Sequence, residues 1–426
     1  MGSRLLMSTF FQLRRHFASM PKADTPPGFK PLKETALFTP FQLGPLKLEH
    51  RIVQAPLTRM RSTKESDGVT VPNDLVAEYY SQRASKGGLQ LTEATDIFKY
   101  AGNYPGAPGL FTDSQVAAWK KVTDGVHAKG GYIFSQLWHT GRATPPSWRN
   151  GQQTVSSSNV PMTGKWMDGV SCEENPPRSL SIEEIHDITK QWGVAAKRAI
   201  EAGFDGIEIH GANGYLLDQF LHDNVNTRTD EYGGSIEGRA KFPLEVIKEC
   251  SKAIGAGRVG IRLSPYNYFQ DTKDSNPNKH WDALCEMIAA LPENERPAYV
   301  HMVEPRFDEE LDEQKKMDAL SAYTSTAGVE AEATIKPKHN TLNNFRNILR
   351  KSGIKFIAAG GFNRDNAVPK LDSNDADLII FGRWFIANPD LPRRLAEGLE
   401  LNAYDRDTFY GADPPQKGYT DYPVAV

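Results

Sequence analysis

The chain has 426 residues, a length that suits one large barrel domain with insertions. Its net charge of −3, with 24% charged residues evenly mixed, excludes a global field that would attract nucleic acid or an anionic membrane. Three cysteines, Cys172, Cys250 and Cys285, are too few and too scattered for a disulfide framework, a zinc site or an iron–sulfur cluster. Without an apolar run of about 18 residues, we expect no membrane helix and a soluble protein of a reducing compartment.

The first 22 residues are basic and apolar, and the first acid is Asp24. That composition resembles a mitochondrial presequence, while a start at Met20 would remove it, so both interpretations stay open. We expect a cytoplasmic protein, or a mitochondrial one if residues 1–22 act as a presequence. Residues 1–34 are expected to form an N-terminal extension that is either disordered or used for targeting, and residues 35–426 a single domain.

A hairpin is predicted over Leu37–Leu48, and after it short apolar runs alternate with stretches of helical period. The predicted strands are Arg51–Ala55, Leu89–Glu93, Tyr132–Leu137, Gly206–His210, Val259–Ser264, Tyr299–Glu304, Lys355–Ala359 and Leu378–Phe381. The predicted helices are Asn73–Ser85, Thr112–Lys129, Ser181–Ala202, Ile236–Ile254, His280–Leu291, Thr341–Lys351 and Asp390–Glu400, with the weakest helical pattern in the connection Asn363–Asp377. Eight strands with helix-sized connections predict parallel pairing and an α/β fold, the (β/α)₈ TIM barrel, rather than a doubly wound sheet.

Two long insertions follow the third and sixth strands, Thr140–Leu180 and Arg306–His339. In a TIM barrel the chemistry lies at the carboxyl ends of the strands, so both insertions belong to that rim, where they can act as lids. Polar or glycine residues also gather at these strand ends, where packing alone would favour apolar ones. They are Thr58, Gln136, His210, Arg262, Gly360–Gly361 and Gly382–Arg383.

The most informative stretch follows the strand Gly206–His210, where an imidazole, a carboxamide and a phenol come from His210, Asn213 and Tyr215. Intervening glycines let the chain turn sharply, so we expect the three groups to converge. Two of them can donate hydrogen bonds to an oxygen that gains negative charge. A phenol, with an ordinary pKa of about 10, stays protonated at neutral pH and can give up a proton.

Two glycine patterns are candidates for a phosphate site. Gly255–Gly260 has the spacing Gly-x-Gly-x-x-Gly, but it follows a helix and leads into a strand, the reverse of the dinucleotide-binding order. The turns at Gly360–Gly361 and Gly382–Arg383 are better placed, because exposed backbone amides and an arginine can hold an anion. The alternative is that these glycines serve only to turn the chain, and their spacing leaves both interpretations open.

Six segments together closely resemble the Old Yellow Enzyme family, and the resemblance runs from about Leu37 to Pro423. They are Arg51–Met60, Ser135–His139, His210–Gln219, Asn226–Ser235, Ile261–Pro265 and Tyr404–Tyr410. The resemblance implies a TIM barrel that holds FMN noncovalently and is reduced by NADPH. It also implies hydride transfer from FMN N5 to the β-carbon of an α,β-unsaturated aldehyde or ketone, by a monomer or a homodimer.

The resemblance also implies a role for each matching residue. Thr58 would hydrogen-bond the flavin carbonyl beside N5, and Gln136 and Arg262 would hold the pyrimidine edge. The ring would be framed by Pro56, Leu57 and Ala94, and the phosphate held by Gly361, Gly382 and Arg383. His210 and Asn213 would grip the substrate carbonyl oxygen, Tyr215 would protonate the α-carbon, and Trp138 at the rim would limit which substrates fit.

Several alternatives remain at this point. A glycosidase of the same fold would use paired carboxylates, for which Glu93 and Glu304 stand at strand ends, but it leaves His210, Asn213 and Tyr215 unexplained. Arg262 could be a structural ion pair with Glu208. A specialised biosynthetic reductase or isomerase of the same family, or a non-catalytic flavin-binding redox protein, would use the same barrel.

Overall fold

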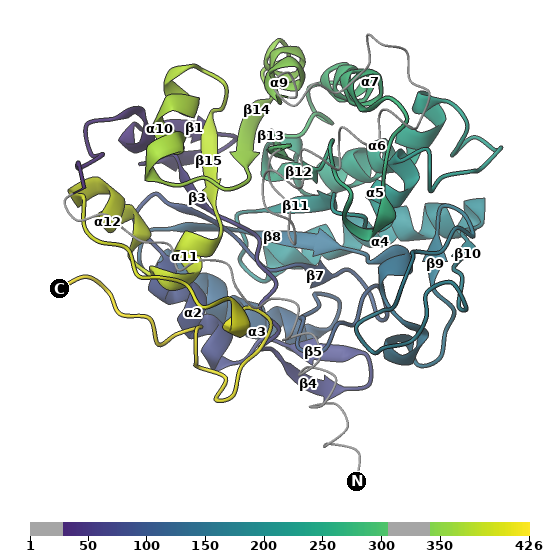
Figure 1. The fold of residues 1–426 in the computed structure, drawn as a ribbon, viewed down its shortest axis with the longest axis horizontal. Helices are drawn as coiled ribbons and strands as arrows, with labels where there is room; N and C mark the ends of the chain where they lie inside the picture. Colours follow the sequence, from purple (N-terminus) through teal and green to yellow (C-terminus); the bar gives the residue numbers. More distant parts are fainter. Residues whose placement is uncertain (1–28, 306–340) are drawn as a thin grey trace.

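Eight parallel strands close into a barrel in the structure, a computed structural model that describes residues 29–305 and 341–426 (Figure 1). Their order around the barrel is β11, β12, β13, β14, β15, β3, β6 and β8, and β8 pairs with β11 to complete the circle. The bounds are β3 (Ile52–Gln54), β6 (Leu89–Leu91), β8 (Tyr132–Trp138), β11 (Gly206–Gly211), β12 (Val259–Leu263), β13 (Tyr299–Val303), β14 (Lys355–Ala359) and β15 (Leu378–Phe381). All eight predicted strands and the predicted TIM barrel are confirmed.

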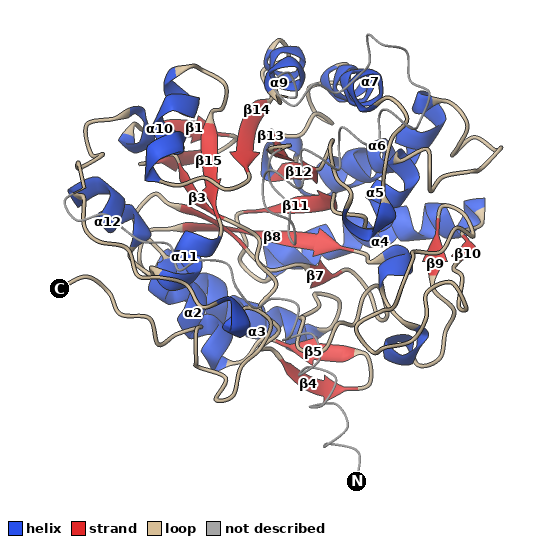
Figure 2. Cartoon of the chain, viewed as in Figure 1, coloured by secondary structure: helices blue, strands red, loops and turns tan. Residues whose placement is uncertain are grey.

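Helices surround these strands (Figure 2). The longer ones are α2 (Asp74–Arg83), α3 (Asp113–His127), α4 (Ile182–Glu201), α6 (Ile236–Ile254), α7 (Pro277–Ala289), α9 (Asn343–Arg350), α10 (Arg364–Asp372) and α12 (Leu391–Glu397). Helix α4 begins with a capping box formed by Ser181 and Glu184. The helix expected from His280 begins three residues earlier, because the Asn276 side chain caps it and proline suits the first turn. The short helices α5 (Leu216–Leu221) and α11 (Arg383–Ala387) were not predicted.

Smaller elements decorate the barrel. The predicted hairpin is β1 (Phe41–Leu43) with β2 (Leu46–Leu48), preceded by η1 (Ala36–Phe38). A second hairpin, β4 (Thr63–Ser66) with β5 (Val69–Val71), follows β3, and β7 (Thr95–Asp96) pairs with the end of β8. The insertion after β8 contains η2 (Gly141–Ala143), η3 (Pro146–Arg149) and the parallel pair β9 (Val155–Ser156) and β10 (Arg178–Ser179). The remaining 3₁₀ turns of the described residues are η4 (Ala256–Arg258), η5 (Phe269–Asp271) and η7 (Arg406–Thr408).

The first hairpin closes one end of the barrel. Leu43, Leu46 and Leu48 join the same buried cluster as Val53 and Phe134 of the barrel strands. A Cβ atom at Gly44 would lie 2.1 Å from the carbonyl oxygen of residue 257, so only glycine permits this approach. The loop that it touches carries the Gly-x-Gly-x-x-Gly pattern, which here leads from α6 through η4 into β12, as predicted. This end is sealed, which leaves the carboxyl ends of the strands for chemistry.

The C-terminal segment is held against the start of the barrel by buried arginines. Arg59 Nη2 donates to the carbonyl of Gly418 at 2.8 Å, and Arg83 Nη2 donates to the carbonyl of Tyr419 at 2.9 Å. The Tyr419 ring stacks on Tyr79 with centroids 4.2 Å apart and an angle of 4° between the planes. The chain downstream of η7 is thereby fixed beside the segment that follows β3.

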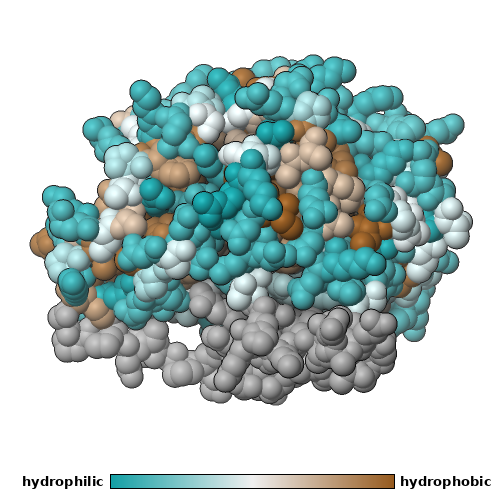
Figure 3. Space-filling model, turned by 90° about the horizontal axis from the view of Figure 1, so that it is seen from above, coloured by the Kyte–Doolittle hydropathy of each residue, from teal (hydrophilic) through white to brown (hydrophobic). Residues whose placement is uncertain are grey.

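The face shown in Figure 3 is mostly hydrophilic, with small hydrophobic patches separated by polar residues. The large hydrophobic residues that are exposed in the described part of the chain are Met167, Val170, Val194, Tyr410, Val424 and Val426. Within residues 29–305 and 341–426, no helix combines the length and apolar character needed to cross a bilayer.

Candidate active site

Strand β11 sends alternate side chains to opposite sides of the barrel wall. Ile207 and Ile209 are fully buried in the cluster beneath the outer helices. Glu208 and His210 point the other way, and in the paired strands they stand opposite Gln136 and Arg262, respectively. The two-residue period therefore places four of the polar residues on neighbouring strands, as the sequence predicted.

Glu208 is the centre of a buried network inside the barrel. Its carboxylate accepts hydrogen bonds from Gln136 Nε2 at 2.8 Å, Tyr299 OH at 3.1 Å and His301 Nδ1 at 3.0 Å. Burial alone would raise the pKa of Glu208, but His301, the nearby Arg262 charge and the Gln136 bond outweigh it and lower that pKa below its usual value. Glu208 is thus an anion stabilised by the nearby Arg262 charge, and its carboxylate also orients the Gln136 side-chain amide.

Three aromatic rings meet at the mouth of the barrel. The Tyr215 ring lies 4.9 Å from the His210 ring and 4.7 Å from the Trp138 ring, measured between centroids, at angles of 75° and 72°. Trp138 and His210 are 6.3 Å apart. Ala94 packs in the same cluster as Trp138 and Tyr215. The structure therefore brings together four residues that the sequence placed at the site.

Tyr104 is a fifth member of this group that the sequence did not indicate. Its ring lies 5.2 Å from Trp138, and its hydroxyl donates to the carbonyl of Ala143 at 2.7 Å. Burial, followed by the neighbouring Tyr215, raises the pKa of Tyr104 well above its usual value. The residue belongs to an irregular loop after β7, where neither period nor motif marks it.

His210 is a neutral imidazole in this setting. Burial, followed by the positive charge of Arg262 and the neighbouring His301, lowers the pKa of His210 well below 6.5. Its Nδ1 atom is buried and has no hydrogen-bond partner among residues 29–305 and 341–426. A neutral ring can donate one hydrogen bond to a ligand oxygen without releasing a proton.

Asn213 lies on the turn between His210 and Tyr215. Its backbone is left-handed, with φ of 57°, and the next residue, Gly214, has φ of 77°. The backbone N–H of Asn213 donates to Ser264 Oγ at 2.8 Å, which connects the turn to the residue that follows β12. Among non-glycine residues asparagine tolerates this conformation best, and the bonds around the turn fix it there.

The predicted cofactor residues occupy adjoining strand ends. Pro56 is buried and Leu57 and Thr58 are half-buried just after β3. A Cβ atom at Gly382, which follows β15, would lie 3.7 Å from the Leu57 side chain, so the ring-framing and phosphate-binding candidates are neighbours. At Gly361, with φ of 64°, an added Cβ would meet nothing within 4 Å.

These features test the fit of a flavin phosphate. The glycine backbone after β14 is open to an approaching group, and Arg383 begins α11 directly after Gly382. An anion suits such a cradle because amides and a guanidinium can both donate to it. The neutral His210 ring, with Nδ1 unused within the described chain, adds a donor for a ligand above the barrel. The residues present fit FMN.

The two carboxylates considered for a glycosidase have other partners. Glu93 is fully buried, accepts the Arg59 amide at 3.3 Å, and burial raises its pKa to about 7. Glu304 pairs with Lys370 Nζ at 2.9 Å. Among the described residues, no group of histidine, cysteine or acidic side chains is arranged to hold a metal ion. This geometry does not support a pair of carboxylates acting on a glycosidic bond.

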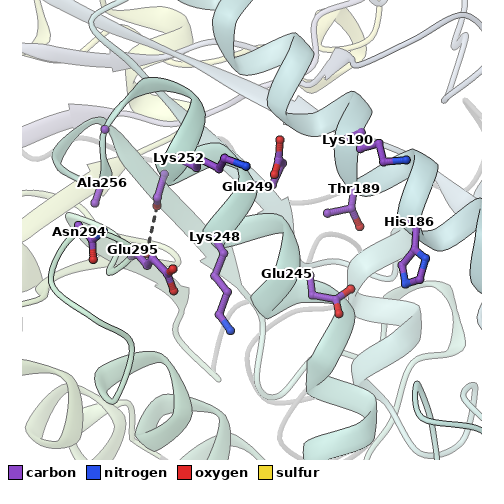
Figure 4. A pocket seen from close by; sticks show the side chains of 12 residues that line it. His186, Thr189, Lys190, Glu245, Lys248, Glu249, Lys252, Ala256, Asn294 and Glu295 are labelled. Carbon is purple, nitrogen blue, oxygen red and sulfur yellow. Dashed lines mark hydrogen bonds between the residues drawn. The ribbon is translucent and has the colours of Figure 1, made fainter.

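A separate hollow of about 860 Å³ lies on the outside of the barrel, between α4 and α6 (Figure 4). Lysines and glutamates alternate around it, including Lys190, Lys248 and Glu249, and Ser251 donates to the carbonyl of Glu295 at 3.0 Å. The mixed charge on flexible side chains defines no ligand. The mouth of the barrel is therefore the candidate active site.

A closed (β/α)₈ barrel with buried polar groups at one mouth is the architecture of a TIM-barrel enzyme. The chain matches the family described as NADH:flavin oxidoreductase / NADH oxidase over residues 36–402. It is 60% identical over 389 residues to the flavin oxidoreductase hxnT of Emericella nidulans, covering 91% of this chain and 97% of that protein. The chain belongs to this family, also known as the Old Yellow Enzyme family, and is a flavin-dependent oxidoreductase.

Plant relatives and solved structures give the same assignment. The chain is 41% identical over 404 residues to 12-oxophytodienoate reductase 7 of Oryza sativa subsp. japonica, covering 93% of this chain and 97% of that protein. Morphinone reductase, solved with tetrahydroNAD, superposes with a TM-score of 0.76 at 39% identity and covers 92% of this chain and 98% of its own. The Old Yellow Enzyme homologue of Zymomonas mobilis gives 0.78 at 36% identity, covering 92% and 100%.

Proposed function

We propose that this protein is an FMN-dependent ene-reductase that uses NADPH to reduce the C=C bond of α,β-unsaturated aldehydes and ketones. The observation that carries the proposal is the mouth of the barrel, where a neutral imidazole and a phenol lie with ring centroids 4.9 Å apart. Two of the relatives, 12-oxophytodienoate reductase and morphinone reductase, have names that describe reductases of ketone-bearing compounds. Their names support the same substrate class here.

FMN would be held by residues of several strand ends. Thr58, Gln136 and Arg262 would hydrogen-bond the ring, and the buried anion Glu208 would keep Gln136 and Arg262 in place. Pro56, Leu57 and Ala94 would frame the ring, and Gly361, Gly382 and Arg383 would hold the phosphate. The bound flavin supplies the hydride for the β-carbon of the substrate.

The residues of the mouth divide the remaining chemistry. His210 and Asn213 donate hydrogen bonds to the substrate carbonyl oxygen and stabilise the enolate that forms as hydride arrives. Tyr215 then gives its proton to the α-carbon, which restores the carbonyl and completes the addition of hydride and proton across the double bond. Trp138, packed against Tyr215 at 4.7 Å, limits the shape of the substrate.

We further propose that residues 35–426 form a single FMN-binding domain. Within the described part of the preceding segment, the Leu32 amide bonds to the carbonyl of Leu395 at 3.0 Å, which joins that segment to α12. The predicted insertion Arg306–His339 lies outside the described residues.

The reductant needs a direct comparison of NADPH with NADH, because the family description names NADH and one solved neighbour carries tetrahydroNAD.

The test is an anaerobic visible absorption experiment on the purified protein. Addition of NADPH, and of NADH in a parallel sample, is expected to bleach the oxidised flavin spectrum, with faster bleaching by NADPH. Addition of 2-cyclohexen-1-one is then expected to restore the spectrum and yield cyclohexanone. Bleaching without recovery on addition of enones or enals would leave a flavoprotein without ene-reductase activity and contradict the proposal.

A further inference from the structure

A buried ionic cluster lies behind the turn that carries Asn213. His222, at the end of α5, places Nε2 3.1 Å from Asp218 Oδ1 and Nδ1 2.9 Å from Asp274 Oδ2. All three side chains are at most 1% exposed. The other groups facing the cluster come from α7, where His280 Nδ1 lies 2.8 Å from Asp274 Oδ1 and Trp281 Nε1 donates to Asp274 Oδ2 at 3.0 Å.

The cluster is ionised, with an imidazolium between two carboxylates. Burial alone would lower the pKa of His222, but Asp274 and Asp218 outweigh burial and raise it to about 10. The reverse holds for Asp274, whose pKa burial would raise but His222 and His280 lower well below its usual value. A buried ion pair of this kind adds little net stability compared with apolar packing, so its value lies in the geometry it imposes.

One of these carboxylates is bonded directly to the turn. Asp218 Oδ2 accepts the Gly214 amide at 2.8 Å and the Ser264 hydroxyl at 3.3 Å. Ser264 Oγ in turn accepts the Asn213 amide at 2.8 Å. A continuous path of hydrogen bonds therefore runs from His222 through Asp218 and Ser264 to the backbone of Asn213.

We propose that His222 is a positioning residue for substrate binding, which acts through Asp218 and Ser264 to hold Asn213 in its left-handed turn and so to aim the Asn213 carboxamide at the substrate oxygen. The inference deepens the proposed function and rests on it, because it assumes that Asn213 binds the carbonyl. When His222 is replaced by a neutral residue, Asp218 loses the cation that lies 3.1 Å from its Oδ1 and holds the carboxylate in place. The Asn213 turn then loses the support that offsets its backbone strain.

The test measures binding rather than turnover, with the FMN-loaded protein and a saturated ketone that cannot be reduced. Isothermal titration calorimetry with cyclohexanone gives the dissociation constant for the wild type, for His222→Gln, for Asn213→Ala and for the double variant. We expect His222→Gln to weaken binding about tenfold, with unchanged FMN content. In the Asn213→Ala background the same change is expected to have no further effect, because the residue on which it acts is gone.

Matched variants separate positioning from general damage. His186→Gln alters an exposed histidine of α4 and is expected to leave the dissociation constant unchanged. Ser264→Ala keeps all three charges and is expected to weaken cyclohexanone binding in the wild type but not in Asn213→Ala, which keeps the test available should His222→Gln fail to fold. His280→Gln removes only an outer contact of Asp274, so we expect a smaller loss than for His222→Gln.

The possible outcomes distinguish the positioning role of His222 from the proposed binding of the carbonyl by Asn213. If His222→Gln or Ser264→Ala weakens binding by the same factor in the Asn213→Ala background as in the wild type, the effects are independent and the positioning role is overturned. Unchanged binding in both His222→Gln and Ser264→Ala would overturn it as well. Unchanged binding in Asn213→Ala itself would instead refute the proposed grip of Asn213 on the carbonyl, and with it that part of the proposed function.

Discussion

Two buried histidines on the same stretch of chain differ in charge, because His210 is neutral and His222 is a cation. His210 closes β11 at the mouth and is 3% exposed, and His222 ends α5 behind it and is 1% exposed. Burial by itself lowers the pKa of both, yet His210 faces the guanidinium of Arg262, whereas His222 faces the carboxylates of Asp218 and Asp274. The charge of a buried histidine is therefore decided by its neighbours rather than by its depth.

The difference matches two tasks. A neutral ring with an unused nitrogen within the described chain suits transient hydrogen bonding to a ligand oxygen. A charged ring with carboxylate oxygens 3.1 and 2.9 Å from its two nitrogens suits permanent support of the surrounding backbone. Each prediction below perturbs one side of this comparison.

The largest effect is expected from Tyr215→Phe, at the mouth. Because this change removes the proposed general acid and little volume, turnover of 2-cyclohexen-1-one should fall by about 10² to 10⁴. Steady-state NADPH consumption with the enone measures the loss, and NADPH oxidation by oxygen should continue. Tyr132→Phe, at the opposite end of β8, is the matched control and should retain enone turnover. Equal activity in the two variants would remove Tyr215 from the mechanism.

The next effect is expected from His210→Gln. A glutamine keeps a donor but cannot place it where the imidazole lies, so kcat/KM for the enone should fall by about 10² to 10³. The assay is steady-state turnover at several enone concentrations, with the FMN content measured alongside. A loss below about threefold would show that the carbonyl oxygen is held elsewhere.

The neutral state of His210 predicts a flat pH profile. Since its pKa lies well below 6.5, lowering the pH from 8 to 6 should not protonate it. The rate of flavin reoxidation by enone should therefore vary less than about twofold across this range. A sigmoidal change centred near pH 6.5 that disappears in His210→Gln would contradict the neutral ring.

On the other side of the comparison, His222 should make stability depend on pH. Its pKa is about 10 in the folded protein against about 6.5 when unfolded, so its contribution is complete below pH 6.5 and is lost as the pH rises toward 10. Melting temperatures at pH 7, 8.5 and 10 should fall more steeply for the wild type than for His222→Gln, by a few degrees. Parallel curves would contradict the charged state of His222 between Asp218 and Asp274.

The smallest effect is expected from Glu93→Gln. Burial favours the neutral form of Glu93, as it favours the neutral form of His210. The pKa of Glu93 is raised to about 7, so the folded state favours its neutral form, and stability is lost as the pH rises from 4.5 through 7. Glu93→Gln should therefore gain stability over the wild type on going from pH 5 to pH 8, by roughly 2 to 3 kcal/mol. Denaturant unfolding at both pH values measures the difference, and the same difference at both would contradict the raised pKa.

The sequence predicted what local pattern controls. Short apolar runs and stretches of helical period predicted the eight strands and the longer helices. Short helices such as α5 were not predicted, because six residues are too few to show a helical repeat of apolar side chains. The place of Tyr104 in the site was not predicted either, because the contacts of a loop residue depend on the folded course of the loop and not on a local sequence pattern.

The ionic cluster shows the same limit. Asp218 and His222 stand four apart on one helix, a spacing that a sequence can reveal. Asp274 lies in the connection after another strand, and no local pattern joins it to His222. The charge of His222 depends on that distant partner, so neither its pKa nor its role follows from the sequence alone.

The most direct test of the central claim is an anaerobic stopped-flow comparison of the wild type and Tyr215→Phe, with the two half-reactions followed separately by flavin absorbance. The account predicts that flavin reduction by NADPH keeps its rate within about twofold, and that reoxidation by 2-cyclohexen-1-one slows by at least about 10². Reoxidation at the wild-type rate, or a loss confined to flavin reduction, would show that the phenol at the mouth does not deliver the proton.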